Sequence, residues 1–324
     1  MKLSHGDVIP VAESTGFSPV MVEKVILLMN LLSSFNTHPS LKGKWVLKGG
    51  TALNLFVFKL PRLSVDIDLN YVGFLDREMM LEDRPIIEKA VQAVCLRENL
   101  RVKQVPTDHA GGKWILSYQS YTGQRGNLEV DFNYMFRQPL VEPISMSSNF
   151  LGTYRALDIP VLDLHELAAG KLAALLARTQ ARDLIDSWKI LSELDLDPLL
   201  LRLSFVVYGG MNRIDWRTVT ADTITFDPED LTRKLLPVLG SNALSGQTPR
   251  DFGEQLANSC RKAISVVLPL NDNEMEFLDR LLENGEIVPG LLSSDTELQD
   301  RIYSQPLLRW KAMNVCKHKV LRQR

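Results

Sequence analysis

The stretch KWVLKGGTALNLFVFKLPRLSVDIDLNY, residues 44–71, decides the fold of this chain. A short apolar run from Trp45 to Leu47 predicts a strand, which leads through a glycine turn into a helix predicted over 51–58. Residues 63–70 then alternate apolar and polar side chains, which is the period of a β-strand. The stretch therefore predicts strand, turn, helix and strand in close succession.

The polar face of the second strand carries Asp66 and Asp68. Two positions apart on a strand, the carboxylates share a face and lie about 7 Å apart along the chain. Hard oxygen ligands at this spacing suit Mg²⁺, which prefers a few carboxylates together with substrate phosphates. Such ions stabilise the attacking and leaving oxygens of a phosphoryl displacement. The pair is therefore the predicted catalytic and metal-binding site.

The turn Lys48-Gly49-Gly50-Thr51 precedes the predicted helix. Free backbone N–H groups and the positive end of a helix dipole favour phosphate binding, and glycine permits close approach. Thr51 is expected to serve as the N-cap or as a phosphate ligand. Alone, a glycine pair is usually only a turn, and a D-x-D strand is usually a solvated sheet face. Their combination, with Asp66 fifteen residues after Thr51, is far more specific.

The strand-like run 127–136 contains the candidates for a third carboxylate. Asp131 lies on the polar face of this run and is the predicted additional metal ligand, with Glu129 as the competitor on the same face. An ordinary exposed aspartate explains the pattern equally well, so the choice stays open.

A second group of charged residues lies in the helix predicted over 162–191. At about 100° per residue, Lys171, Arg178, Arg182 and Asp186 fall within an arc of roughly 80°. Such a row suits binding of a triphosphate or of leaving pyrophosphate. Asp183 lies about 120° from Lys171, towards the apolar edge, where an unpaired carboxylate is costly. The plainer explanation is an amphipathic helix with solvated cations and an Arg182–Asp186 pair.

The rest of the chain predicts an α+β fold, with a mixed sheet flanked by helices and followed by a mostly helical region. Helices are expected over 17–35 and 77–98, strands over 101–105, 113–121 and 127–136, and helices with short loops after about 192. The expected domains are 1–158 and 159–324.

Composition excludes several classes of protein. The net charge of −2 does not indicate a nucleic-acid binder, so RNA contacts would need a local patch. Three cysteines without paired spacing argue against a disulfide framework or a zinc finger. No signal peptide is evident, and no segment approaches the ~20 apolar residues of a membrane span. A cytoplasmic protein without membrane contact is expected.

The segments GGTALNL, RLSVDIDL and a lysine-bearing helix ending in RDLID resemble the AbiEii/AbiGii-type nucleotidyltransferase toxin family. The matching segments cover about 44–72 and 160–192. The family pattern falls on Gly49, Gly50 and Thr51, on Asp66 and Asp68, on Lys171, and on Arg182, Asp183 and Asp186. Ser64 also matches a serine of the family's active site. No motif departs from the pattern.

The resemblance implies a polymerase-β-like nucleotidyltransferase core that uses Mg²⁺ and a nucleoside triphosphate. It implies tRNA as acceptor, extended at its 3′ end so that translation is blocked, and a DNA-binding antitoxin as partner in a toxin–antitoxin, phage-defence pair. Ser64 would be the acceptor in a self-modifying enzyme. In this scheme Lys171, Arg178 and Arg182 offset phosphate charge, Asp183 positions a reacting group, and Lys48 and Asp186 complete the nucleotide site.

Two alternatives and one surface stay open. The chain is alternatively a nucleotidyltransferase that modifies a protein or a small molecule, or a nucleotide-binding regulatory module without transfer activity. RNA contacts are expected from Lys42, Lys44 and Lys48 or from the C-terminal tail, whose cations are Arg309, Lys311, Lys317, Lys319, Arg322 and Arg324. The identity of the nucleotide is not predicted.

Overall fold

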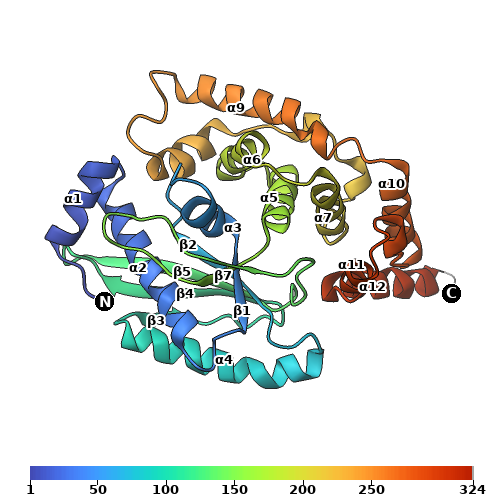
Figure 1. Cartoon of the computed structure of the whole chain (residues 1–324), viewed down its shortest axis with the longest axis horizontal. Helices are drawn as coiled ribbons and strands as arrows, with labels where there is room; N and C mark the ends of the chain where they lie inside the picture. Colours follow the sequence, from blue (N-terminus) through green and yellow to red (C-terminus); the bar gives the residue numbers. More distant parts are fainter. Residues whose placement is uncertain (323–324) are drawn as a thin grey trace. The chain divides into compact units, whose positions relative to one another are not determined.

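A mixed sheet with the strand order β3-β4-β5-β2-β1-β7-β6 forms the centre of the first of two units (Figure 1). The computed structural model describes residues 1–322, and this first unit comprises Met1–Arg137, Pro143–Leu162 and Leu236–Gly246. The strands are β1 Trp45–Lys48, β2 Asp66–Tyr71, β3 Arg101–Gln104, β4 Gly111–Gln119, β5 Arg125–Asn133, β6 Ile144–Met146 and β7 Ile159–Val161. The expected mixed sheet is confirmed.

Strand β2 lies between β1, to which it is antiparallel, and β5, to which it is parallel. It begins at Asp66, three residues later than the alternating pattern predicts. The residues before it bond elsewhere: the Leu63 amide donates to the Val238 carbonyl at 2.8 Å, and Arg62 forms a β-bridge with Leu239. The late segment 236–246 therefore takes the place of a sheet partner at this point.

Helices α2 Pro19–Thr37 and α4 Arg77–Arg97 pack against one face of this sheet, whereas α3 Gly49–Thr51 contacts β2 beside its aspartates. The helical segments of the first unit are α1 His5–Thr15, α2 Pro19–Thr37, α3 Gly49–Thr51, the wide π-type turn Ala52–Val57, α4 Arg77–Arg97 and the turn Leu236–Val238. From α2, the Phe35 ring lies 6.3 Å from that of Phe132 on β5. From α4, Asp83 accepts a hydrogen bond of 2.6 Å from the Tyr71 hydroxyl on β2. The side chains that alternate with Phe132 and Tyr71 therefore point to the other face.

Helix α2 corrects one expectation. Its 19 residues are long and apolar enough to cross a membrane by length and composition, although no such segment was expected. In its most apolar window 61% of the residues are buried inside the protein, as in the core helix of a globular domain.

The second unit is helical and comprises Gln138–Glu142, Asp163–Leu235 and the residues from Gln247 onward. Its longer helices are α5 Leu164–Arg178, α6 Ala181–Glu193, α7 Pro198–Gly210, α9 Pro249–Ala263, α10 Asp272–Asp279, α11 Thr296–Tyr303 and α12 Pro306–Arg322. Shorter turns are Trp216–Thr218, Ala221–Thr223, α8 Pro228–Asp230, Leu231–Leu235, Ile264–Val266, Arg280–Asn284 and Pro289–Leu291. Helix α5 packs against α6 and α7, and α6 packs against α9.

The single helix predicted over 162–191 is wrong. Thr179 adopts a left-handed conformation with φ of 47°, which ends α5, and α6 begins at Ala181. The domain limits also differ from a single cut after residue 158. Residues 159–162 and 236–246 belong to the first unit, and 138–142 belong to the second.

Glu166 on α5 is one of the buried acids of the second unit. It accepts hydrogen bonds from the amides of Leu140 and Val141, at 2.8 and 3.1 Å, and from the Tyr208 hydroxyl at 3.0 Å. Burial nevertheless raises the pKa of Glu166 from 4.5 to about 7, because desolvation of the charge outweighs these bonds.

This raised pKa predicts a pH-dependent stability. Below about 4.5 the carboxyl is protonated in both states, and between 4.5 and 7 the folded state binds the proton more tightly. Stability from this group is therefore lost as pH rises through that window, by a few kcal/mol at order of magnitude. Glu166→Gln should remove the loss, so urea midpoints at pH 5 and pH 8 should differ less in the variant. An unchanged difference would contradict the assignment.

Candidate active site

Four carboxylates gather on one face of two neighbouring strands. Parallel pairing of β2 with β5 sets Asp66 opposite Glu129 and Asp68 opposite Asp131. The residues between them, Ile67 and Val130, are fully buried, whereas the four acids are half-buried. Adjacent strands lie about 4.8 Å apart, so the acids occupy neighbouring positions on one face. The predicted alternation is confirmed over 66–69 of β2 and over 128–132 of β5, whereas Ser64 and Asn70 of the predicted polar face are buried.

The glycine turn meets the second aspartate of β2. Gly49 has φ of +75°, a conformation that side chains rarely adopt. A Cβ at this position would lie 2.3 Å from Oδ2 of Asp68. The close approach of turn and carboxylate therefore requires glycine. Lys48, which pairs with Asp68 in the β1–β2 register, precedes the turn.

The side chains of Thr51 and Ser64 hold Asp66 in position by hydrogen bonds. Thr51 is fully buried, and its hydroxyl donates a hydrogen bond to the Asp66 carbonyl. The N-cap expected at Thr51 is wrong, since Lys48 occupies that position and Thr51 lies inside the helical turn. Ser64 is also buried, and its Oγ donates to Oδ1 of Asp66 at 3.1 Å. Both hydroxyls therefore position Asp66, one through its backbone and one through its carboxylate.

Two cations that lie near the acids were not predicted from the sequence. Arg62 is buried, and a Cβ on Gly50 would lie 2.7 Å from its Nη2, so this guanidinium adjoins the turn. On β4, Lys113 Nζ lies 2.6 Å from Oε2 of Glu129. The hydrogen bond to Glu129 raises the pKa of Lys113, and the negative charges of Glu129, Asp66 and Asp131 raise it further. The alternation of β4 could have indicated Lys113, but nothing in the sequence pairs it with β5.

The donor set fits a hard divalent cation. Asp66 and Asp68 carry their carboxylates on one face of β2, beside a turn whose space a Cβ would fill. Mg²⁺ takes one or two carboxylates and completes its octahedron with phosphates and water. Within residues 1–322 no three Asp, Glu, His or Cys side chains converge as a ready metal site. Asp131 therefore faces Asp68 across the strands without completing a three-ligand group.

The charged residues of α5 and α6 form a separate cluster. Lys171 Nζ lies 2.9 Å from Oδ1 of Asp183 and 3.1 Å from Oδ2 of Asp186. Arg178 Nε donates to Oδ2 of Asp183 at 2.7 Å. Burial alone would raise the pKa of Asp183, but the charges of Lys171 and Arg178 lower it below its ordinary range.

This geometry corrects the single arc of cations. Lys171 and Arg178 lie on α5, whereas Arg182, Asp183 and Asp186 lie on α6. Lys171 pairs with the two buried aspartates, and the charge of Arg182 acts on Asp230. Asp186 pairs with Lys171, and not with Arg182 as in the plainer explanation of an amphipathic helix.

Some of the C-terminal cations expected to contact RNA already make hydrogen bonds within the protein. Lys311 donates to the Asn212 carbonyl at 2.5 Å, and Lys319 donates to Oδ1 of Asn284 at 2.7 Å. Arg324 lies outside the described residues, and the side chain of Arg322 is also outside them.

The chain is similar to known proteins in both sequence and fold. The model of the family described as "Nucleotidyl transferase AbiEii toxin, Type IV TA system" matches residues 30–258, more than half of the chain. The solved structure of MenT4, a nucleotidyltransferase toxin from Mycobacterium tuberculosis H37Rv, is similar with a TM-score of 0.56 and 18% sequence identity. The similarity covers 95% of this chain and 99% of that one, and it shows a shared fold. No curated protein sequence matches.

Removal of the Lys171 ammonium should destabilise the second unit. Lys171→Met leaves two buried carboxylates without the cation they share, which typically costs about 3–5 kcal/mol. Thermal unfolding should therefore shift to lower temperature, and Lys171→Met/Asp186→Asn should recover part of the loss. Lys262→Met, at an exposed position on α9, is the control with little expected effect. Equal melting of Lys171→Met and the wild type would contradict a stabilising role.

Proposed function

The chain belongs to the AbiEii family of type IV toxin–antitoxin nucleotidyltransferases, and from this premise we propose that it adds a nucleotide to the 3′ end of an RNA, with tRNA as the first candidate. Membership makes it a nucleotidyltransferase toxin that uses a nucleoside triphosphate and has an antitoxin partner. The RNA acceptor, the block of translation and the cytoplasmic location belong to the proposal, as does an antitoxin that binds DNA.

One observation carries the proposed mechanism. Asp66 and Asp68 lie on the face of β2 opposite to the face packed by α2 and α4, and Asp68 abuts the backbone of Gly49. Carboxylates suited to a divalent cation and a turn suited to phosphate are therefore adjacent, which supports the proposed nucleotidyl transfer.

In this mechanism Asp66 and Asp68 would hold Mg²⁺, which when bound would neutralise charge on the triphosphate and on the leaving pyrophosphate. Gly49 and Gly50 offer the turn backbone to the phosphates, with Lys48 beside them. Ser64 orients Asp66 through its 3.1 Å hydrogen bond. The RNA hydroxyl forms a bond to the α-phosphorus, the bond to pyrophosphate breaks, and the hydroxyl proton passes to solvent.

Other predicted roles rest on the sequence and the resemblance. Phosphate binding by Lys171, Arg178 and Arg182 stays a prediction, as does a catalytic role for Asp183 and Asp186. Within their own unit, the two aspartates hold Lys171. For the third carboxylate, we propose Asp131 over Glu129, because Glu129 is already paired with Lys113 at 2.6 Å.

Removal of either β2 carboxylate should abolish transfer. Purified protein is incubated with total RNA and each nucleoside triphosphate, labelled at the α- or the γ-phosphate, with and without Mg²⁺. Wild type should transfer only the α-label to RNA, and Asp66→Asn or Asp68→Asn should lower the rate by roughly 10²–10³-fold or more. Asp300→Asn, at an exposed site in α11, is the control.

The same assay separates the other possibilities. Asp131→Asn should reduce transfer more than Glu129→Gln. Label on the protein or on a small molecule, with none on RNA, would replace the proposed acceptor. Absence of transfer to any acceptor would favour a nucleotide-binding module, and full activity of Asp66→Asn would contradict the metal assignment.

A methyl group at Gly49 should separate the turn from the aspartate. Gly49→Ala adds a Cβ that would lie 2.3 Å from Oδ2 of Asp68, so the carboxylate must move and transfer should fall by roughly 10²-fold. Gly43→Ala is the matched control, because Gly43 has φ of +74° and nothing within 4 Å of the added carbon. Both variants carry the strain of a left-handed alanine, about 1–2 kcal/mol. Equal activities would show that the Gly49–Asp68 contact is unimportant.

A further inference from the structure

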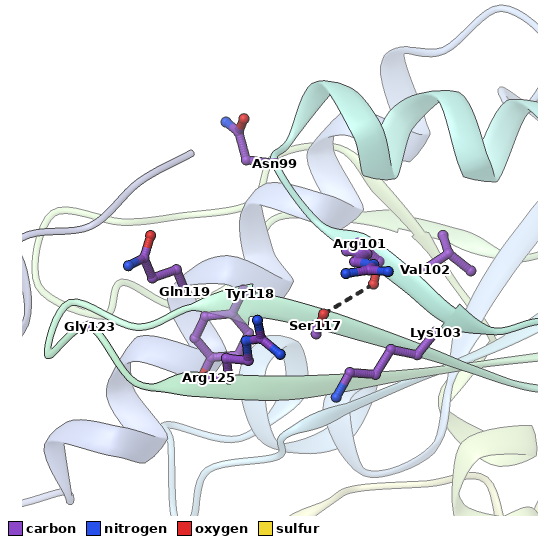
Figure 2. A pocket seen from close by; sticks show the side chains of 9 residues that line it. All are labelled: Asn99, Arg101, Val102, Lys103, Ser117, Tyr118, Gln119, Gly123 and Arg125. Carbon is purple, nitrogen blue, oxygen red and sulfur yellow. Dashed lines mark hydrogen bonds between the residues drawn. The ribbon is translucent and has the colours of Figure 1, made fainter.

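A basic hollow lies at the end of the sheet formed by β3, β4 and the start of β5 (Figure 2). Its cations are Arg101 and Lys103 on β3 and Arg125 on β5, and all three side chains are exposed. Figure 2 shows Ser117 of β4 between the two strands, with its hydroxyl bonded to the Arg101 carbonyl. We use "basic hollow" for this surface, defined by Arg101, Lys103 and Arg125.

The basic hollow is on the same sheet face as the proposed active site. On β5, Arg125 and Asn127 have the same alternation as Glu129 and Asp131. The register carries this face across to β3, because Asn127 pairs with Ser117 and Ser117 pairs with Arg101. Lys103 reaches the same side, where its Nζ donates to Oδ1 of Asn127 at 3.0 Å. A single face therefore changes from basic to acidic along β5.

The positive charge of the hollow is not neutralised. Within residues 1–322, the guanidinium groups of Arg101 and Arg125 make no hydrogen bond or ion pair, and no Asp or Glu is among the described residues that line the hollow. Like charges gathered without acids oppose folding and favour an anionic ligand. In a chain of net charge −2, such a local group of cations indicates a specific partner.

The distance along β5 fits a strand of nucleic acid. Glu129 and Asp131 lie four and six positions after Arg125, which is about 13 to 20 Å at 3.3 Å per residue. The phosphates of a stacked strand rise about 3.4 Å per nucleotide along its axis. Glu129 and Asp131 lie opposite Asp66 and Asp68. If the 3′ end of the RNA is bound at these acids, the phosphates about four to six nucleotides upstream of that end would lie over the basic hollow.

We propose that Arg101, Lys103 and Arg125 bind backbone phosphates of the RNA acceptor, upstream of the end that receives the nucleotide. The inference rests on the proposed function for its choice of RNA, and it adds the surface that holds the acceptor. Because contacts to phosphate carry no base information, the basic hollow sets the position of the strand and not its sequence.

Charge removal with a matched control tests the proposal. The variant of the basic hollow is Arg101→Gln/Lys103→Gln/Arg125→Gln. The control variant, Arg233→Gln/Arg250→Gln/Lys262→Gln, also removes two arginines and one lysine, but from exposed positions of the second unit. The probe is a fluorescein-labelled 12-nucleotide single-stranded RNA, with binding followed by anisotropy from low to high salt. Polyglutamate is the competing anion.

The variant of the hollow should bind the oligonucleotide roughly tenfold more weakly than the control variant at physiological salt. Its slope of log affinity against log salt should be shallower by about 2, since each lost phosphate contact removes about 0.7 for a single strand. In the transfer assay its KM for RNA should rise while its KM for the nucleoside triphosphate stays unchanged.

Other results would overturn the inference. These are equal affinity and salt slope in the two triple variants, no binding by the wild type, or competition by polyglutamate as strong as by RNA, which would indicate an acidic protein partner. Failure of the proposed function is recognised separately, because the anisotropy experiment needs no transfer. If wild type moves no label to RNA but the hollow variant alone loses oligonucleotide binding, only the proposed function fails.

Discussion

The contact between the Gly49 backbone and the Asp68 carboxylate is the constraint on which the proposed site depends. The antiparallel register sets the last residue of β1, Lys48, opposite Asp68, so the turn after β1 meets that side chain directly. There is room for the carboxylate only because Gly49 lacks a Cβ and accepts φ of +75°. The Thr51 hydroxyl then bonds the Asp66 carbonyl, which ties the start of β2 to the same turn.

Burial of one sheet face determines the chemistry of the other. Because α2 and α4 pack against Phe132 and Tyr71, the residues that alternate with them are directed to the opposite side of the sheet. On that side β5 carries Arg125 at its start and Asp131 near its end. The same alternation that builds the core therefore also arranges charge along a line, from cations to carboxylates, without any additional structural element.

The sequence alone was sufficient to predict features that depend on residues close together in the chain. Alternation predicted which residues of β2 and β5 share the polar face, and the glycine turn was found at its correct place. Nonlocal pairing was not predictable: nothing in β4 shows that Lys113 will meet Glu129, and nothing before β2 shows that Leu63 will bond to Val238. The end of α5 was also hidden, because Thr179 is neither glycine nor proline and its left-handed conformation costs about 1–2 kcal/mol locally.

Tertiary ion pairing offers a physical reason for that unexpected turn. Asp183 and Asp186 are three residues apart on α6, so both carboxylates enter the interior on one side of the helix. Leaving them buried without a cation would be costly. A continuous helix would carry Lys171 more than three turns away from Asp183, about 18 Å at 1.5 Å per residue. Reversal at Thr179 brings the ammonium to 2.9 Å, so the charges specify how α5 and α6 meet, although apolar side chains could stabilise the pair equally well.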